Sequence, residues 1–204
     1  MRETCAEFRI SDTAVQKDST AMQTSSSLRI AVFCGSKSGS DPGYSQEAYL
    51  LGQQLALRGC SLVYGGGRAG LMGIIADAAL AHGARVTGII PRFLNTLERK
   101  HEQLTEQIEV DSMHERKTLL YERCDAAIAM PGGVGTLDEL FELLTWNQLT
   151  LHHKKAALLN INGFYDHLYL HIRQMRNQEF LHETFSDPVL IGSTASEVLD
   201  LLTA

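Results

Sequence analysis

The chain has 204 residues, of which 44% are hydrophobic and 21% charged, and this composition is typical of one compact globular domain with its own core. The formal net charge of −6 argues against nucleic-acid binding, because few cations are left over to neutralise a row of phosphates. No uninterrupted apolar run approaches the ~18 residues that a membrane-spanning helix needs. We therefore expect neither a nucleic acid nor a membrane as a partner.

Residues 1–27 mix charged and hydroxyl side chains and contain few large apolar ones. They lack the apolar centre of a secretory signal. We expect a disordered tail, because so few apolar groups cannot offset the entropy lost on ordering. The four cysteines, Cys5, Cys34, Cys60 and Cys124, include no C-x-x-C pair. Cys34 and Cys60 lie in or beside apolar runs and are interpreted as buried thiols, which favours a reducing, cytoplasmic location.

From residue 28 onward, short apolar runs that predict strands alternate with longer amphipathic segments that predict helices. The predicted strands span residues 28–34, 61–64, 85–90, 107–110, 126–130, 155–160 and 188–192, and Pro91 is expected to end the third. The predicted helices span about 44–58, 71–83 and 113–124, and three more begin near residues 136, 165 and 194. Capping boxes at Ser112–Glu115 and Thr194–Glu197 and a C′ residue at Gly83 mark helix ends.

Buried strands that read as continuous apolar runs, each followed by a helix, predict a parallel sheet covered on both faces. The predicted fold class is therefore α/β: a single-domain, Rossmann-like, doubly wound parallel sheet over residues 28–204. Ligands of such sheets bind beyond the carboxyl ends of the strands. Three glycine-rich segments fall at such ends, namely Gly35, Gly65–Gly67 and Gly132–Gly135.

The segment GGGRAG at 65–70 fits the G-x-G-x-x-G pattern of dinucleotide sites. That pattern needs an acidic residue about 20 positions further on to hold a ribose hydroxyl. Residues 85–93, RVTGIIPRF, contain no acid, and the segment does not follow the first strand. A cradle for a smaller phosphate and close strand–helix packing remain as interpretations. An NADP-dependent oxidoreductase is kept as an alternative, with Arg92 as the residue that would read a 2′-phosphate.

The segment PGGVGT at 131–136 is more specific. Its glycines let main-chain N–H groups approach a ligand, and a helix N-terminus favours an anion. A simpler explanation is a capping box formed by Thr136 and Glu139, with Glu139 in the first turn of the helix. A cap does not explain three closely spaced glycines, which cost backbone entropy. We therefore predict a phosphate site at this corner.

The segment MHERK at 113–117 places Arg116 and Lys117 in the first turns of a helix, where the dipole favours anions rather than cations. A solvated charge pair is the ordinary explanation for such a run, but this unfavourable position indicates recognition of an anion. His152 and His153, and the pair His167 and His171, lack a third ligand at suitable spacing, so no metal site is expected.

Taken together, MHERK, PGGVGTLDE and TWNQLTLHHK, with GSKSGSDPGY and VYGGGRAGLMG before them, resemble the signatures of the Lonely Guy (LOG) family. The resemblance covers about residues 28–202. It implies a cytokinin riboside 5′-monophosphate phosphoribohydrolase, which hydrolyses the N-glycosidic bond of a nucleotide to free base and ribose 5-phosphate, without a cofactor. It also implies a homodimer or larger homo-oligomer, with the site near a subunit boundary.

The resemblance also assigns residues. Arg116 and Glu139 match the family's catalytic pair. The positions that match its substrate contacts are Glu98, Arg116, Lys117, Gly132, Gly133, Val134, Gly135, Thr136, Leu137, Asp138 and Thr145. The chain departs from the family pattern at three places: Asp138 where Glu is frequent, Thr150 where Gly is expected, and Lys155 where Pro is expected.

Alternatives to this hydrolase remain open. A protein of the same fold could carry a nucleotide or a phosphorylated cofactor without turning it over, and Glu139 is the residue that such a carrier does not need. Family members have also been labelled lysine decarboxylases, but the sequence identifies no lysine that would bind pyridoxal phosphate. The preferred base, adenine or an N6-prenylated adenine, and the proton donor to the departing base are not identified by any residue.

Overall fold

The computed structural model describes residues 27–94, 100–182 and 189–204. Most of the predicted tail, residues 1–27, and the predicted contact Glu98 lie outside the described residues. The strands are β1 Arg29–Phe33, β2 Ser61–Tyr64, β3 Val86–Pro91, β4 Glu106–Val110, β5 Ala126–Ala129, β6 Lys155–Leu159 and β7 Leu190–Gly192. The α-helices are α1 Pro42–Leu57, α2 Gly70–Ala81, α3 Met113–Glu122, α4 Val134–Gln148, α5 Asp166–Asn177 and α6 Ala195–Thr203. Short 3₁₀ turns lie at Arg92–Leu94 and Ile161–Gly163.

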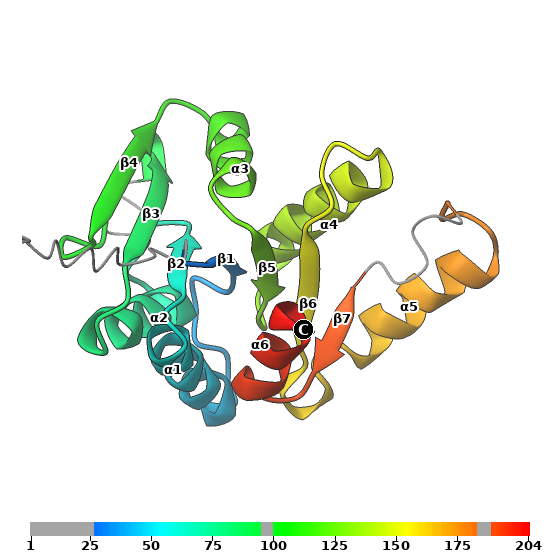
Figure 1. Ribbon diagram of the computed structural model, residues 1–204, viewed down its shortest axis with the longest axis horizontal. Helices are drawn as coiled ribbons and strands as arrows, with labels where there is room; N and C mark the ends of the chain where they lie inside the picture. Colours follow the sequence, from blue (N-terminus) through cyan, green and yellow to red (C-terminus); the bar gives the residue numbers. More distant parts are fainter. Residues whose placement is uncertain (1–26, 95–99, 183–188) are drawn as a thin grey trace, which may run out of the picture.

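The strands form one seven-stranded sheet in the order β4-β3-β2-β1-β5-β6-β7, and all neighbouring strands in it pair in parallel (Figure 1). The chain builds outward from β1 to β4, then returns to the other side of β1 with β5. This reversal makes the gap beyond β1 and β5 the topological switch point, where ligands of such sheets bind. The predicted fold class is confirmed.

Helices cover both faces of the sheet because successive side chains of each buried strand point to opposite faces. In β1, Ile30 and Val32 pack with α1, α2 and α6 in one core cluster. Ala31 and Phe33 pack with α3, α4 and α5 in the other. The burial of both sides explains why these strands read as continuous apolar runs. No helix in the described part of the chain is long and apolar enough to cross a membrane.

Several predicted helix ends are confirmed by side-chain or main-chain hydrogen bonds. Ser112 caps α3 by accepting from the Glu115 N–H at 3.1 Å, and Thr194 caps α6 by accepting from the Glu197 N–H at 3.3 Å. Gly83 follows α2 with φ +87°, the left-handed C′ conformation that glycine adopts most easily.

Two predicted details are wrong. Pro91 is the last residue of β3, paired with Val110, rather than the residue after the strand. Helix α4 begins at Val134 with Gly133 as its N-cap, so Thr136 and Glu139 do not form a capping box and Glu139 lies in the second turn. The glycine corner itself starts the helix, with no capping hydrogen bond from a side chain of the described residues. Capping therefore does not explain Glu139.

Helix α4 ends in a strained conformation at Thr150, whose φ is +59°. The Thr150 N–H donates to the Asn147 carbonyl at 3.0 Å, and the Leu151 N–H donates to the Trp146 carbonyl at 3.0 Å. These two bonds form a Schellman motif, which favours glycine at its left-handed residue. The position at which the sequence departs from the expected glycine is thus one where glycine is physically favoured.

Candidate active site

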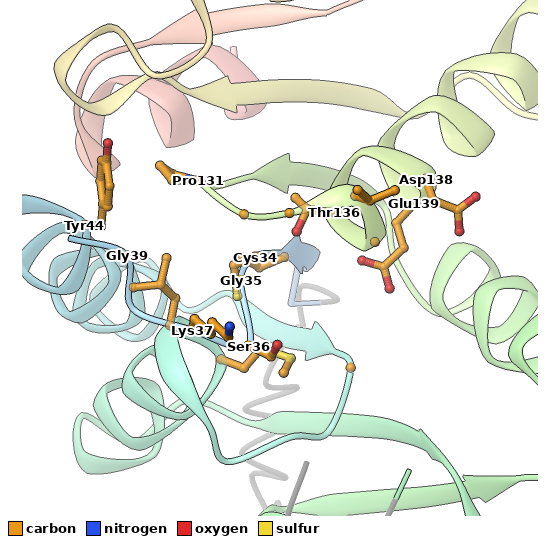
Figure 2. Close-up of a pocket in the computed structure, with 18 of the residues that line it drawn as sticks. Cys34, Gly35, Ser36, Lys37, Gly39, Tyr44, Pro131, Thr136, Asp138 and Glu139 are labelled. Carbon is orange, nitrogen blue, oxygen red and sulfur yellow. The ribbon is translucent and has the colours of Figure 1, made fainter. Parts of the chain in front are cut away.

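A cavity of about 470 Å³ lies beyond the carboxyl ends of β1 and β5, at the switch point of the sheet (Figure 2). The loop after β1, residues 34–39, forms one wall, and the β5–α4 corner with the start of α4, residues 131–139, forms another. Arg116 and Met113 reach the cavity from α3, and Tyr44 and Phe164 lie at its lining from α1 and the segment before α5. All three predicted glycine-rich segments contribute residues to this cavity.

Hydrogen bonds and close packing fix the position of the β5–α4 corner. The buried Tyr165 hydroxyl donates to the Met130 carbonyl at 2.6 Å, and the Gly35 N–H donates to the Pro131 carbonyl at 3.1 Å. Gly132 has no room for a side chain, because an added Cβ would lie 2.1 Å from Thr136 Oγ1. The position of the corner is thus fixed by the loop after β1, by Thr136 and by the buried phenol of Tyr165.

Gly133 and Gly135 differ from Gly132. An added Cβ at either position would meet no described atom within 4 Å, and neither residue has a left-handed φ. Packing of the described residues therefore does not require glycine here. Because the first N–H groups of a helix have no intrahelical acceptors, this open corner can hold an anion against the main chain.

Arg116 is a buried cation with its side chain fixed to the main chain. It is 6% exposed, its Nε donates to the Ile89 carbonyl at 3.2 Å, and its Nη2 donates to the Gly65 carbonyl at 3.1 Å. Nη1 lies 3.8 Å from Met113 Sδ, a weak acceptor. Arg116 is among the residues that line the cavity, so a ligand there would meet a cation that is already oriented.

Neighbouring acids on α4 point in different directions. Figure 2 shows the Glu139 carboxylate directed toward the cavity and the Asp138 carboxylate turned away from it. Asp138 accepts from Lys117 Nζ at 3.1 Å, and Glu142 lies 2.7 Å from the same nitrogen. These hydrogen bonds, that to Glu142 foremost, raise the pKa of Lys117 and hold its charge. Of these acids, Glu139 is the one presented to a ligand.

Cys34 lies in the cavity lining near Glu139 as a buried free thiol. Burial raises the pKa of this thiol well above its ordinary value, and the Glu139 carboxylate raises it further. The group therefore stays neutral at physiological pH and is a poor nucleophile. Cys60 and Cys124 are also buried and free, so the prediction of buried thiols at Cys34 and Cys60 is confirmed.

The structure gathers most of the predicted site residues, but not all, in this cavity. Eight line it: Arg116, Gly132, Gly133, Val134, Gly135, Thr136, Asp138 and Glu139. Lys117, Leu137 and Thr145 instead line a second, shallower hollow of about 390 Å³ beside α4. Val134 and Asp138 line both hollows, so the two meet at the first turns of α4.

Lys37 is a cavity residue that the sequence analysis missed. It lies in the loop after β1, is exposed, and forms no ion pair or hydrogen bond with its side chain in the part of the chain that the structure describes. An ammonium group in the same cavity as the open corner would add to the attraction for an anion. A lysine in a Gly/Ser-rich loop has no sequence pattern that separates it from a solvated surface charge.

The structure gives packing reasons for glycines in GGGRAG. An added Cβ at Gly70 would lie 2.4 Å from the Lys37 main-chain nitrogen, and at Gly73, just beyond the motif, 2.0 Å from the Arg68 carbonyl. Of the two interpretations left open for this segment, close packing therefore applies at Gly70.

The structure combines a doubly wound parallel sheet with an open glycine corner, a fixed arginine and an inward-facing glutamate at its switch point. This arrangement is typical of α/β proteins that bind a small anionic ligand. Comparison with known proteins narrows the class. Residues 72–202 match the family described as "possible lysine decarboxylase". The chain is 44% identical over 174 residues to cytokinin riboside 5′-monophosphate phosphoribohydrolase LOG2 of Arabidopsis thaliana, covering 85% of this chain and 82% of that protein.

A second Arabidopsis relative, the probable cytokinin riboside 5′-monophosphate phosphoribohydrolase LOG6, is 40% identical over 183 residues, covering 90% of this chain and 91% of the relative. Among solved structures, a molybdenum cofactor binding protein from Rippkaea orientalis aligns with TM-score 0.67 at 25% identity, over 87% of this chain and 96% of that one. The chain belongs to the LOG family.

Proposed function

We propose that the protein is an N-glycosyl hydrolase that cleaves adenosine 5′-monophosphate, or its N6-modified forms, to free base and ribose 5-phosphate. The relatives named above as phosphoribohydrolases support this reaction class. The observation that carries the proposal is the direction of Glu139, whose carboxylate faces the cavity beside the anion-binding corner although it has no capping role.

The geometry supports two separate roles along α4, phosphate binding at its start and contact with the ribose at Glu139. The open corner at Gly133 and Gly135 would bind the 5′-phosphate through main-chain N–H groups. Glu139 follows Gly135 by four residues, or ~6 Å along the helix axis. The ribose would therefore lie beside the carboxylate when the phosphate is bound. Binding energy from the phosphate then positions the anomeric carbon, which is not itself held by the corner.

Cleavage of the N-glycosidic bond develops positive charge on the ribose. A carboxylate fixed beside the sugar stabilises that charge and orients the attacking water. Water supplies the hydroxyl to the anomeric carbon and a proton to the departing base nitrogen. Arg116, held by two main-chain carbonyls, would align the ribose or the phosphate without having to reorganise during the reaction.

The test is release of base from a panel of nucleoside 5′-monophosphates and their N6-prenylated forms. Glu139→Gln keeps the size of the side chain and removes its charge, so turnover should fall by about a thousandfold or more. The melting temperature should change little, because Glu139 does not cap α4 and the substitution keeps the size of the side chain. The matched control is Glu122→Gln, an exposed acid at the end of α3, which should keep full activity. Near-normal base release by Glu139→Gln would refute the assignment.

A second candidate function is a carrier of a phosphorylated cofactor, favoured by the similarity to the Rippkaea orientalis protein. A carrier binds its cargo in the same cavity but has no use for a carboxylate beside the sugar. Tight binding of AMP that releases no adenine, and that is unchanged in Glu139→Gln, would establish the carrier in place of the hydrolase.

We also infer that the protein acts as a homodimer or larger homo-oligomer. Lys117, Leu137 and Thr145, which match substrate contacts of the family, lie in the second hollow beside α4 rather than in the main cavity. Val134, at the junction of the two hollows, is 85% exposed. A second subunit packed over this part of α4 would bring these residues next to a bound nucleotide. Sedimentation at micromolar concentration should give at least twice the chain mass of 22.5 kDa, and a single-chain mass would contradict this inference.

A cytoplasmic location is part of the same proposal. The described cysteines Cys34, Cys60 and Cys124 are all buried and free, as is common where thiols are kept reduced. Fractionation of cells that produce the full chain, with an antibody to the protein, would test this, and recovery outside the cytoplasm would contradict it.

A further inference from the structure

The side chain of Arg116 lies across the point where two strands separate. Pairing between β2 and β3 ends at Tyr64 and Gly88. The residue that follows each of these along the chain is Gly65, just beyond β2, and Ile89 in β3, and their carbonyls accept hydrogen bonds from the guanidinium at 3.1 Å and 3.2 Å. Arg116 thus takes the place of main-chain pairing at the fork, and the two carbonyls set the plane of its guanidinium.

Because Gly65 has no side chain, the guanidinium of Arg116 can lie close to its main chain. A Cβ added at Gly65 would lie 1.9 Å from Arg116 Nη2 and 3.1 Å from its Cζ. The third nearest described atom is Met72 Sδ at 3.5 Å, an ordinary van der Waals contact. Gly65 has no left-handed φ, so its backbone conformation is open to any residue. The requirement for glycine at this position therefore comes from Arg116.

The obstacle at Gly65 differs in kind from the obstacle at Gly70. Gly70 combines a left-handed φ with contact to the main chain of Ser36 and Lys37, which cannot move aside. At Gly65 the obstacle is the end of a flexible arginine, which can move aside. A methyl group there would leave the strands in place and displace the guanidinium from its two carbonyls.

We propose that Gly65 is a positioning residue for the reaction: its missing side chain forms the seat in which the Arg116 guanidinium lies flat against β2 and β3 and faces the nucleotide. The proposal rests on the proposed function, in which Arg116 aligns ribose or phosphate. In this proposal Gly65 acts on the reaction through the position of Arg116.

The test is a double-mutant cycle on the full chain with Gly65→Ala, Arg116→Ala and both together. In the presence of Arg116, Gly65→Ala should lower kcat/KM about 100-fold, because a shift of ~1 Å in an aligning group costs about that much. In the Arg116→Ala background the two atoms that crowd the added methyl are gone, and the nearest one left is Met72 Sδ at 3.5 Å, so Gly65→Ala should change kcat/KM less than about twofold. A structural role for Gly65 that is independent of Arg116 would give the same loss in both backgrounds and would overturn the proposal, as would an unchanged kcat/KM in Gly65→Ala.

The melting temperature and the Kd for AMP, from calorimetry, are also measured for each variant of the cycle. These two quantities test the proposal even where turnover is too slow to measure. If Gly65→Ala fails to fold while the double variant folds, the clash with Arg116 is established. If both fail, Gly65 serves another purpose and the proposal is wrong. If the wild-type protein releases no base from any nucleotide, the proposed function fails, and the melting temperatures still decide whether Gly65 seats Arg116.

Gly83→Ala is the matched control. Gly83 has φ +87° and open space around its would-be Cβ in the described structure, and it lies at the end of α2 outside the cavity lining. This variant should lower the melting temperature equally with and without Arg116, and should leave kcat/KM unchanged in the wild-type background.

Discussion

The two glycine-rich corners of the cavity look alike in sequence and differ in physical cause. After β2, the space beside Gly65 is filled by Arg116 and the space beside Gly70 by the main chain of the β1 loop. After β5, the spaces beside Gly133 and Gly135 are open within the described structure. Where the space beside a glycine is filled by other atoms, packing explains why the residue is glycine. Open space, with an unstrained φ, leaves close approach of a ligand as the explanation. Similar glycine-rich segments thus pack against other parts of the protein at one corner and leave room for a ligand at the other.

The largest expected effect is at a packing glycine. Gly70→Ala adds a methyl 2.4 Å from main-chain atoms at a residue whose φ is +59°. The variant should lose about 3 kcal/mol or more of folding free energy, which corresponds to a melting temperature lower by about 6–12 °C for a chain of this size. Thermal melts followed by circular dichroism measure it. A melting temperature within about 2 °C of wild type would show that the two corners do not differ as described.

The open glycines should show the reverse behaviour. Gly133→Ala and Gly135→Ala meet no described atom, and alanine is the better helix former at Gly135, so stability should stay within about 1 kcal/mol of wild type or rise. The added methyl groups stand where a phosphate would approach the main chain, so kcat/KM should fall about 10- to 100-fold. Melting curves and base-release kinetics on the same samples check both. Loss of stability with unchanged kinetics would assign these glycines to packing.

The charge of Lys37, which lines the same cavity as the open corner, gives a further test of whether that corner binds an anion. Lys37→Met removes the ammonium group of Lys37, which has no ion-pair partner among the described residues. If Lys37 attracts the phosphate, KM should rise about tenfold, in the range of one charge-assisted hydrogen bond. The control is Lys155→Met, which removes the same charge at an exposed residue at the start of β6 and should leave KM unchanged. Equal KM values for the two variants would make Lys37 a solvated charge.

The smallest effect is expected where a favoured glycine is missing. Thr150 has a β-branched side chain at φ +59°, in the left-handed position of the Schellman motif that ends α4. Thr150→Gly relieves that conformation and should stabilise the protein by about 1 kcal/mol, or about 2–4 °C in melting temperature. Activity should not change, because Thr150 is not a cavity residue. A lower melting temperature would mean that Thr150 gains more from its side chain than its backbone conformation costs.

The sheet and its helices could be predicted from the sequence because the apolar runs of the strands and the capping residues of the helices indicate the same elements. Strands buried on both faces are continuous apolar runs, and Ser112 and Thr194 cap helices with their own side chains, which a sequence displays. The start of α4 was predicted two to three residues late, because Gly133 caps the helix without a side chain and Thr136, inside the first turn, resembles a cap.

The candidate site could be predicted only in part, for a similar reason. Arg116 and Glu139 are identified by motifs that resemble those of the family. The partners that orient Arg116 are main-chain carbonyls on two other strands, and any residue type can provide a carbonyl. Lys37 and the distribution of contacts between two hollows depend on how loops meet across the sheet, which no local pattern encodes.

Arg116 and Glu139 belong to different helices, and one lysine ties those helices together. Lys117, next to Arg116 on α3, forms ion pairs with Asp138 and Glu142 on α4, one on either side of Glu139. The Tyr121 hydroxyl of α3 also donates to the main-chain carbonyl of Glu139 at 3.1 Å. The separation between the guanidinium and the carboxylate therefore depends on two supports: the carbonyls of Gly65 and Ile89 that hold the Arg116 side chain, and the brace between α3 and α4. Under the proposed function, a homologue that changes the length of that brace also changes the space left for a sugar between the two charges.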